Sequence, residues 1–255
     1  MKKLTSLLLT FCLLLSLVAF AANAAAADTI TVTVTIADKT GKLVLAAEPV
    51  TVKDVDGDRL FTVNDTLACA HEQYYGSADG YEAEASVLYG LSLAKLWGQT
   101  NNYCFGYYLN DISCWSLLDV VKQNDRLAAF AYRDTEKWSD VYTICTPNTA
   151  RVKTGEALRM TVKKLQYDKM FNLLELPVAG ATITVDGKAT NLVTNENGEV
   201  EIRILMPGEH VVSVTSETEL LVPFATRVQT SFDLIAFVQG LYHMVVNWVM
   251  NLFNK

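Results

Sequence analysis

The stretch Thr29–Ile36 reads TITVTVTI and decides how the first part of the chain folds. Isoleucine and valine alternate with threonine at a strict period of two, which is typical of a strand that buries one face. After a turn at Gly41-Lys42, a second strand-like run covers Leu43–Val55 and is interrupted by Pro49. We therefore expect the first domain to begin with a pair of strands.

Downstream of this pair, the sequence predicts one helix and three more strands. Asp65–Tyr75 has helical character. Phe105–Leu109 and Ile112–Trp115 flank the turn-prone dipeptide Asn110-Asp111, as expected of a β-hairpin. Leu127–Tyr132 is a further apolar strand. The first domain should therefore combine a small sheet with a short helix.

Upstream of Thr29, residues 1–27 have the pattern of a cleavable secretory signal. Lys2 and Lys3 form a positive start, Leu4–Phe20 is an uncharged apolar run, and Ala22-Asn23-Ala24 offers small residues to signal peptidase. A retained membrane anchor is the alternative, but the apolar run is short for one and ends in small residues. We therefore expect a secreted protein, associated with the cell surface or the membrane.

Length and charge limit the possible functions. About 228 residues remain after the expected cleavage, which suits two small domains better than one. Removing Lys2 and Lys3 from the 21 basic residues, against 28 acidic ones, moves the formal charge from −7 to −9. An acidic chain without a basic patch cannot displace counterions from phosphates, so we expect no nucleic-acid partner.

The composition changes near Thr146-Pro147-Asn148, where we expect the first domain, residues 28–147, to end. Beyond this point, strand-like runs alternate with turn dipeptides such as Asp186-Gly187 and Asn197-Gly198. This spacing is typical of a β-sandwich, here expected over residues 148–228. The runs are Leu158–Leu165, Ala181–Val185, Glu199–Leu205 and His210–Thr215.

The last segment, residues 229–255, predicts a helix over Phe232–Phe253. Most of the circumference of this helix is apolar, and this apolar face is too wide for a monomer to leave exposed. We expect residues 232–255 to contact a membrane surface or to mediate self-association. The polar residues recur every three or four positions, which places them on one narrow stripe of the helix: Gln239, His243, Asn247, Asn251 and Asn254.

Four cysteines remain after the expected cleavage, and all lie in the first part of the chain. An even number of cysteines in an exported protein predicts two disulfides, with three possible connectivities. Metal ligation is less favoured because the chain has no Cys-x-x-Cys pair. The disulfide candidates are Cys69, Cys104, Cys114 and Cys145.

The sharpest local motif is the acidic loop Asp54–Asp65. Aligned on the twelve-residue calcium loop of EF-hands, it places carboxylates at positions 1, 3, 5 and 12, and calcium needs six to eight oxygen ligands. Two departures weaken the motif: Arg59 replaces the turn glycine at position 6, and no helix-like segment precedes the loop. The alternative is an acidic surface turn. The candidate Ca²⁺ ligands are Asp54, Asp56, Asp58, Leu60, Thr62 and Asp65.

Aromatic residues are dense between Trp97 and Tyr142. Alternation along a strand sends Tyr107 and Tyr108 to opposite faces, so one set should be core and the other could stack on a flat ligand. The alternative is that all of them pack in the small sheet. The candidate ligand-binding residues are Trp97, Tyr107, Tyr108, Trp115, Trp138 and Tyr142.

Short motifs spread over the first domain carry a family resemblance: Ala70-His71, Tyr89–Ser92, Leu96–Gly98, Phe105–Asn110, Trp115–Leu117, Asp125, Ala129–Tyr132 and Trp138–Tyr142. Together they resemble the transcobalamin C-terminal-like domain of exported Firmicutes proteins. The resemblance implies a β-grasp fold, in which a small mixed sheet wraps one helix, and ligand binding. In transcobalamin the related domain closes over a corrinoid. Pro177–Val185 and Thr194-x-x-x-Gly198 resemble bacterial immunoglobulin-like or carboxypeptidase-regulatory-like modules.

Catalysis has little support, because the chain has no Gly-x-Ser-x-Gly elbow, no HExxH and no phosphate-binding glycine loop. His71 is a lone helical histidine, a type that is more often structural than a general base. We predict a mainly β fold: a β-grasp-like α+β domain, an immunoglobulin-like sandwich and a C-terminal amphipathic helix. The predicted function is non-enzymatic binding of a small ligand, for which the resemblance implies a corrinoid, or of a cell-surface component. The alternative is a structural or adhesion protein whose domains are spacers.

Overall fold

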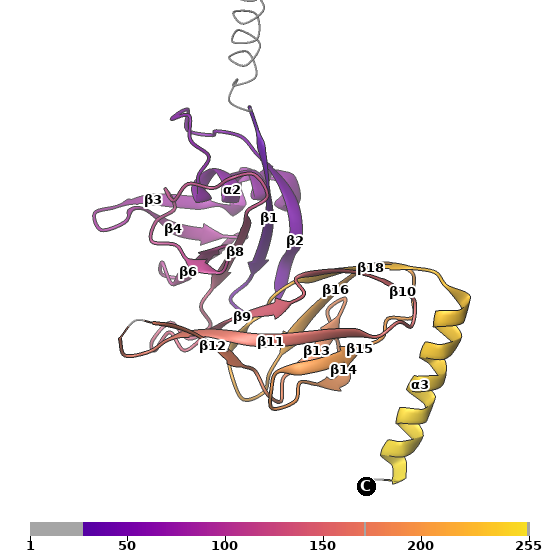
Figure 1. The fold of residues 1–255 in the computed structure, drawn as a ribbon. Helices are drawn as coiled ribbons and strands as arrows, with labels where there is room; N and C mark the ends of the chain where they lie inside the picture. Colours follow the sequence, from indigo (N-terminus) through magenta and orange to yellow (C-terminus); the bar gives the residue numbers. More distant parts are fainter. Residues whose placement is uncertain (1–27, 171, 254–255) are drawn as a thin grey trace, which may run out of the picture.

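The computed structural model describes residues 28–170 and 172–253, so the expected signal segment 1–27 lies outside the described residues. The described chain forms two β-rich domains followed by a helix (Figure 1). The fold class predicted from the sequence is confirmed: the chain is mainly β, with a short helix in the first domain, an immunoglobulin-like sandwich and a C-terminal helix.

The first domain is built on a mixed sheet with strand order β2-β1-β8-β6-β7. Strand β1 pairs antiparallel with β2 and parallel with β8, and β8 pairs antiparallel with β6. This central parallel pair, flanked by antiparallel strands and covered by helix α2, is the arrangement expected of a β-grasp. The elements are β1 (Ile30–Ala37), β2 (Leu43–Val52), α2 (Val63–Ala70), β6 (Phe105–Leu109), β7 (Ile112–Ser113) and β8 (Arg126–Ala131).

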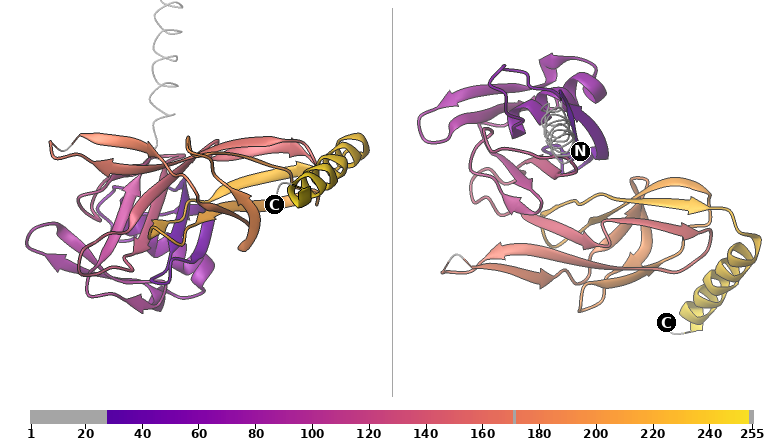
Figure 2. Two further views of the ribbon diagram at one scale, coloured as in Figure 1. Left: turned by 90° about the horizontal axis from the view of Figure 1, so that it is seen from below. Right: turned by 45° about the horizontal axis from the view of Figure 1, so that its top comes forward.

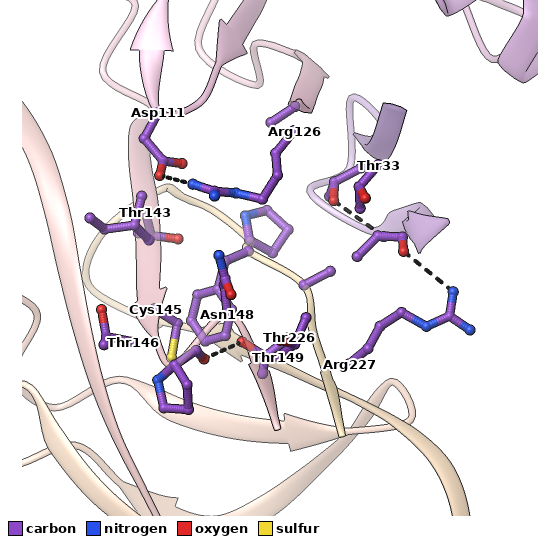
Figure 3. A pocket seen from close by; sticks show the side chains of 18 of the residues that line it. Thr33, Asp111, Arg126, Thr143, Cys145, Thr146, Asn148, Thr149, Thr226 and Arg227 are labelled. Atoms are coloured by element: carbon purple, nitrogen blue, oxygen red, sulfur yellow. Dashed lines mark hydrogen bonds and ion pairs between the residues drawn. The ribbon is translucent and has the colours of Figure 1, made fainter. Parts of the chain in front are cut away.

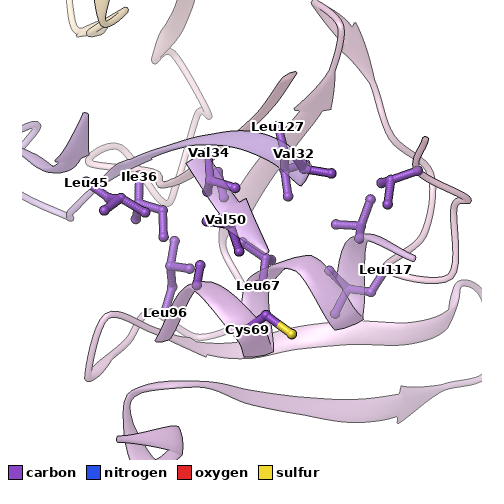
Figure 4. Packing of buried hydrophobic residues seen from close by; sticks show 14 of the residues in the cluster. Val32, Val34, Ile36, Leu45, Val50, Leu67, Cys69, Leu96, Leu117 and Leu127 are labelled. Atoms are coloured by element: carbon purple, nitrogen blue, oxygen red, sulfur yellow. The ribbon is translucent and has the colours of Figure 1, made fainter. Parts of the chain in front are cut away.

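The core of this domain lies between the sheet and α2 (Figure 4). The alternation in Thr29–Ile36 works as expected, because Val32, Val34 and Ile36 are fully buried while the threonines between them are half-buried. Leu67 of α2 packs against these residues from the other side. Helix α2 starts at Val63 because Thr62 and Asp65 form a capping box.

A second, three-stranded sheet was not predicted. It has strand order β3-β4-β5 and follows the π-helical turn η1 that extends α2. The sequence of β3 is EAEAS, which has low strand propensity because Glu and Ala are both depleted in strands. The elements are η1 (His71–Tyr75), η2 (Ala78–Gly80), β3 (Glu82–Ser86), β4 (Gly90–Leu96) and β5 (Gln99–Thr100).

The second domain packs two sheets over one apolar core. One sheet has the order β10-β18-β16-β13-β14, and the other has β12-β11-β9-β17, with β15 also paired to β11. The strands are β9 (Val141–Thr146), β10 (Thr149–Lys153), β11 (Leu158–Tyr167), β12 (Leu173–Pro177), β13 (Thr182–Val185), β14 (Lys188–Val193), β15 (Glu199–Ile202), β16 (Gly208–Thr215), β17 (Leu221–Val222) and β18 (Thr226–Ser231).

The junction between the domains lies earlier than the sequence predicted. Strand β9 pairs with β11 and β17 of the sandwich, so Val141–Thr146 belongs to the second domain, ahead of the boundary expected at 147. A separate apolar cluster joins the two domains and contains Phe130 and Tyr142. An ion pair between Arg227 and Glu48 adds a second link. The two domains therefore pack on one another.

Helix α3 (Leu234–Phe253) follows the last strand and lies at one end of the sandwich, outside both β-rich domains (Figures 1 and 2). It confirms the helix expected over the last segment. Within residues 28–170 and 172–253, no helix is long and apolar enough to cross a membrane.

Candidate functional site

An open cavity of about 290 Å³ lies beside the β6–β7 hairpin in the first domain. Four of the six predicted ligand-binding aromatics line it, namely Tyr107, Tyr108, Trp115 and Trp138. The β3–β4 hairpin contributes to its lining as well. The other lining residues are Tyr89, Ser92, Leu93, Tyr103, Phe105, Gly106, Ser113, Cys114 and Tyr132.

The tight turn of the β6–β7 hairpin sets the positions of Tyr107 and Tyr108. Asn110 and Asp111 both have positive φ angles, of 51° and 68°, which is the backbone of a tight hairpin turn. The Asn110 side chain fixes this turn to β8, because its amide donates to the carboxylate of Asp125 at 2.8 Å and its oxygen accepts from the N–H of Arg126. The hairpin that lines the cavity is thus held to the central sheet.

Carboxylates hold the two loops that present the tryptophans. Asp134 accepts hydrogen bonds from the backbone of Glu136 and Lys137, and the Trp138 indole Nε1 donates to the Thr135 carbonyl at 3.1 Å. Asp119 accepts from the backbone N–H of Trp115 at 2.9 Å. These bonds order both loops without using the faces of the rings.

The cavity combines exposed rings with uncharged polar groups. Side chains at its mouth are largely exposed: Trp115 is 79% exposed, Trp138 is 60% and Tyr103 is 57%. No charged side chain is among the described residues that line it. Burial raises the pKa of both Tyr107 and Tyr108 to about 12. The site can therefore stack on a ring and exchange hydrogen bonds through neutral hydroxyls.

Trp97 and Tyr142 do not belong to this cavity, which corrects their assignment to the ligand site. Trp97 is half-buried beside the turn η1, where its ring lies 5.1 Å from that of His71. Tyr142 is buried between the domains and stacks on Tyr108 with ring centroids 3.9 Å apart. Burial raises the pKa of Tyr142 well above its usual value. Both residues pack because a distant element covers them.

Sequence reasoning did not assign Tyr89, Tyr103 or Tyr132 to the site. Tyr103 lies in a turn with Asn102 in which both residues have positive φ, and the dipeptide Asn101-Asn102 was the available signal for that turn. Tyr132 supports Trp138 from behind, with ring centroids 5.5 Å apart. Nothing in the local pattern places Tyr89 near the hairpin.

The acidic loop keeps three of its predicted calcium ligands together. Carboxylate oxygens of Asp54, Asp56 and Asp58 lie within 4.8 Å of one another. Arg59 adopts a φ of 72°, so it occupies the left-handed conformation that glycine has in an EF-hand loop. Calcium binding by these three residues stays a prediction.

Asp65 and Thr62 have a different role from the predicted one. Both are buried, and the Asp65 carboxylate accepts from the N–H and hydroxyl of Thr62 and from the N–H of Val55 at 2.9 Å. It therefore caps helix α2, and its oxygens are already bonded within the protein. Leu60 is exposed, and its backbone N–H donates to Asp58.

The four cysteines that the structure describes are free thiols, which corrects the expectation of two disulfides. Cys69 lies in the core of the first domain and Cys145 in that of the second, so these two cannot meet. Cys114 lies opposite Tyr107 on the β6–β7 hairpin. Cys104 directly precedes β6 and is three residues before Tyr107 in the chain. Burial raises the pKa of Cys114 and of Cys145 to about 12, so both stay protonated and unreactive.

A second cavity, of about 440 Å³, lies between the domains (Figure 3). Its charged groups are already paired, as Arg126 is with Asp111 at 2.5 Å. Its buried threonines are also bonded within the protein, because Thr143 donates to the Val222 carbonyl and Thr226 to that of Pro147.

No family model and no curated protein sequence matches this chain. Among solved structures it is similar to fibronectin(III)-like modules of Clostridium thermocellum CbhA, at 11% identity over 50% of this chain and 77% of that one, with a TM-score of 0.28. Tandem Ig repeats of Dlar are similar at 12% identity over 62% and 77%, with a TM-score of 0.26. The N-terminal four Ig domains of Dscam1 isoform 7.44 match at 12% over 81% and 47%, with a TM-score of 0.23. Scores this low carry no argument about function.

Proposed function

We propose that this chain is an exported, non-enzymatic surface protein whose first domain binds a small uncharged ring compound in the aromatic cavity. The observation that carries the proposal is the exposure of Trp115 and Trp138 at the mouth of a cavity whose described lining has no charge. Exposed indoles are unfavourable in water, and here two of them border one hollow. The resemblance of residues 28–147 to the transcobalamin C-terminal-like family is consistent with a binding role.

A neutral sugar ring is the ligand class that this chemistry favours. One face of a pyranose carries C–H groups that can lie on an indole, and its hydroxyls can pair with those of Tyr107, Tyr108 and Ser113. Charged ligands would find no described counter-charge in the lining. The volume of about 290 Å³ lies at the low end of ligand pockets, which suits one or two sugar rings. The corrinoid implied by the resemblance is much larger and could place only an edge there.

The alternative, a structural or adhesion protein with spacer domains, is favoured by the packing between the domains. The cluster around Tyr142 and the Arg227–Glu48 pair would keep the two domains in one orientation. A spacer of this kind would have no small ligand.

Calorimetric titration of residues 28–255 with a panel of neutral mono- and disaccharides, and with cyanocobalamin as the corrinoid, tests the proposal. We expect a saccharide to bind and to raise the melting temperature, because a ligand of the folded state must stabilise it. Trp115→Ala and Trp138→Ala should each weaken binding at least about tenfold, or about 1.4 kcal/mol. The matched control is Trp248→Ala, which removes an exposed tryptophan of α3. Absence of binding by the whole panel, or unchanged affinity in both cavity variants, would overturn the proposal. Binding of cyanocobalamin alone would replace the ligand class.

A further inference from the structure

Helix α3 exposes an unusually large apolar surface for a helix at the end of a folded domain. Its sequence, LIAFVQGLYHMVVNWVMNLF, contains no Asp, Glu, Lys or Arg. At 3.6 residues per turn, its large apolar side chains cover roughly two thirds of the circumference. Exposed members of this apolar arc are Leu234, Ile235, Val238, Leu241, Tyr242, Met244, Val245, Val246 and Trp248.

The opposite, narrow side of α3 faces the sandwich. Gly240 is buried, and a Cβ atom added there would lie 2.5 Å from the Cα of Gly155, so the two backbones approach closely. Gln239 and His243 line a hollow together with Lys153 of the sandwich. The stripe of small and polar residues thus lies toward the protein, and the apolar arc is turned outward.

The start of the helix is fixed to the sandwich by Asp233. Its carboxylate forms an ion pair with Lys153 at 2.9 Å and accepts from the N–H of Ala236, and its own N–H donates to the hydroxyl of Thr154. These bonds and the Gly155–Gly240 contact set the direction in which α3 leaves the body. The outward position of the apolar arc is therefore built into the fold.

We infer that α3 is an interfacial helix, which lies flat on a lipid bilayer with its apolar arc among the acyl chains. A second copy of α3 would cover only a narrow seam, leaving most of the arc in water, and α3 has no charged residues to set a helix-pair register. A lipid surface covers the whole arc at once. Tyr242 and Trp248 are the residue types that favour the membrane–water boundary.

A flat orientation agrees with the polar stripe and with the charge of the protein. A spanning helix would bury Gln239, His243 and Asn247 at membrane depth, whereas a flat one keeps them in water. Because α3 carries no basic residue and the whole chain is acidic, apolar burial must supply the binding free energy. Binding should therefore not require anionic lipid and should change little with salt.

Co-sedimentation of residues 28–255 with phosphatidylcholine vesicles tests the inference, since residues 1–27 would themselves bind lipid. We expect binding to pure phosphatidylcholine that is not increased by phosphatidylglycerol. Leu241→Asp and Val245→Asp, both at exposed positions of the arc, should each weaken binding at least about tenfold. The matched control is Asn247→Asp on the polar stripe, which should bind within about twofold of the unchanged protein.

Three outcomes would overturn the inference. The first is no binding to either kind of vesicle. The second is equal loss in the arc and stripe variants. The third is a soluble oligomer, detected by light scattering, that Leu241→Asp and Val245→Asp convert to a monomer in protein that does not bind vesicles. That last result would assign the arc to a second copy of the chain. All three are independent of whether the aromatic cavity binds a ligand.

Discussion

Two groups of aromatic side chains in the first domain contain similar residues but have opposite environments. In the closed group, Trp97 packs against His71 and Tyr75, with ring centroids 5.1 and 5.3 Å apart. In the open group, Trp115 and Trp138 project from loops beside a cavity. All three tryptophans lie in turns or loops, so the local structure around each of them is similar in kind. The difference shows that a covering element, rather than residue type, decides which tryptophan can meet a ligand.

The covering element of the closed group is the turn η1 at the end of α2. Tyr75 lies over two glycines, since a Cβ at Gly98 would be 2.4 Å from its hydroxyl and one at Gly80 would be 2.5 Å from its ring. The backbone N–H of Trp97 donates to the Nε2 atom of His71 at 2.9 Å. No described element of this kind lies over Trp115.

The largest effect expected from this comparison is the loss of stability in Trp97→Ala. Truncating a tryptophan in a packed cluster removes buried apolar area and leaves a cavity, which should cost about 3 kcal/mol. Urea denaturation measures this change, and the same variant should leave saccharide affinity nearly unchanged. A loss of ligand affinity with unaltered stability would mean that Trp97 belongs to the binding site, and that the two groups do not differ in the way described.

An intermediate effect should appear when pH is lowered, because the closed group contains a buried neutral histidine. The Nδ1 atom of His71 donates to the Leu67 carbonyl at 2.6 Å while its Nε2 accepts from Trp97. Burial lowers the pKa of His71, and this outweighs the raising effect of the Leu67 hydrogen bond. The unfolded chain then takes up a proton first, so the stability from neutral His71 is complete above about pH 6.5 and declines as pH falls toward the lower folded pKa.

Melting curves from about pH 7.5 to about pH 5 should show this decline. In His71→Gln the melting temperature should depend less on pH over the same range, because the titrating group is gone. The carboxylates of the domain titrate in both proteins and provide the common background. If the melting temperature depended equally on pH in the two proteins, the fold would not be holding His71 in its neutral form.

The parts of this molecule that the sequence predicted are those fixed by local patterns. The period of two in Thr29–Ile36, the hairpin turn at Asn110-Asp111 and the polar stripe of the last helix are each visible within one segment. Thr62 and Asp65 also have the spacing of a capping box, although both were predicted to bind calcium. That spacing also fitted a calcium loop, and the local pattern alone did not decide between them.

The parts that the sequence did not predict depend on contacts between distant segments. Trp97 is covered by η1, and Tyr142 of the second domain is covered by the first domain through its stack on Tyr108. Strand β9 joined the sandwich because its partners β11 and β17 lie later in the chain. Tyr89 reaches the aromatic cavity through a hairpin whose first strand has little strand propensity. None of these contacts leaves a periodic signal in the sequence.

The smallest effect is expected for stability in Trp115→Ala, and it is the sharpest test of the open group. The side chain is 79% exposed, so its removal takes away little buried apolar area. The free energy of unfolding should therefore change by less than about 0.5 kcal/mol. The hydrogen bond from the backbone N–H of residue 115 to Asp119 does not involve the indole, so the loop should keep its geometry. Urea denaturation of this variant beside Trp97→Ala gives the contrast directly. A loss above about 1 kcal/mol would show that the Trp115 ring is packed in solution, in which case it would not be free to stack on a ligand.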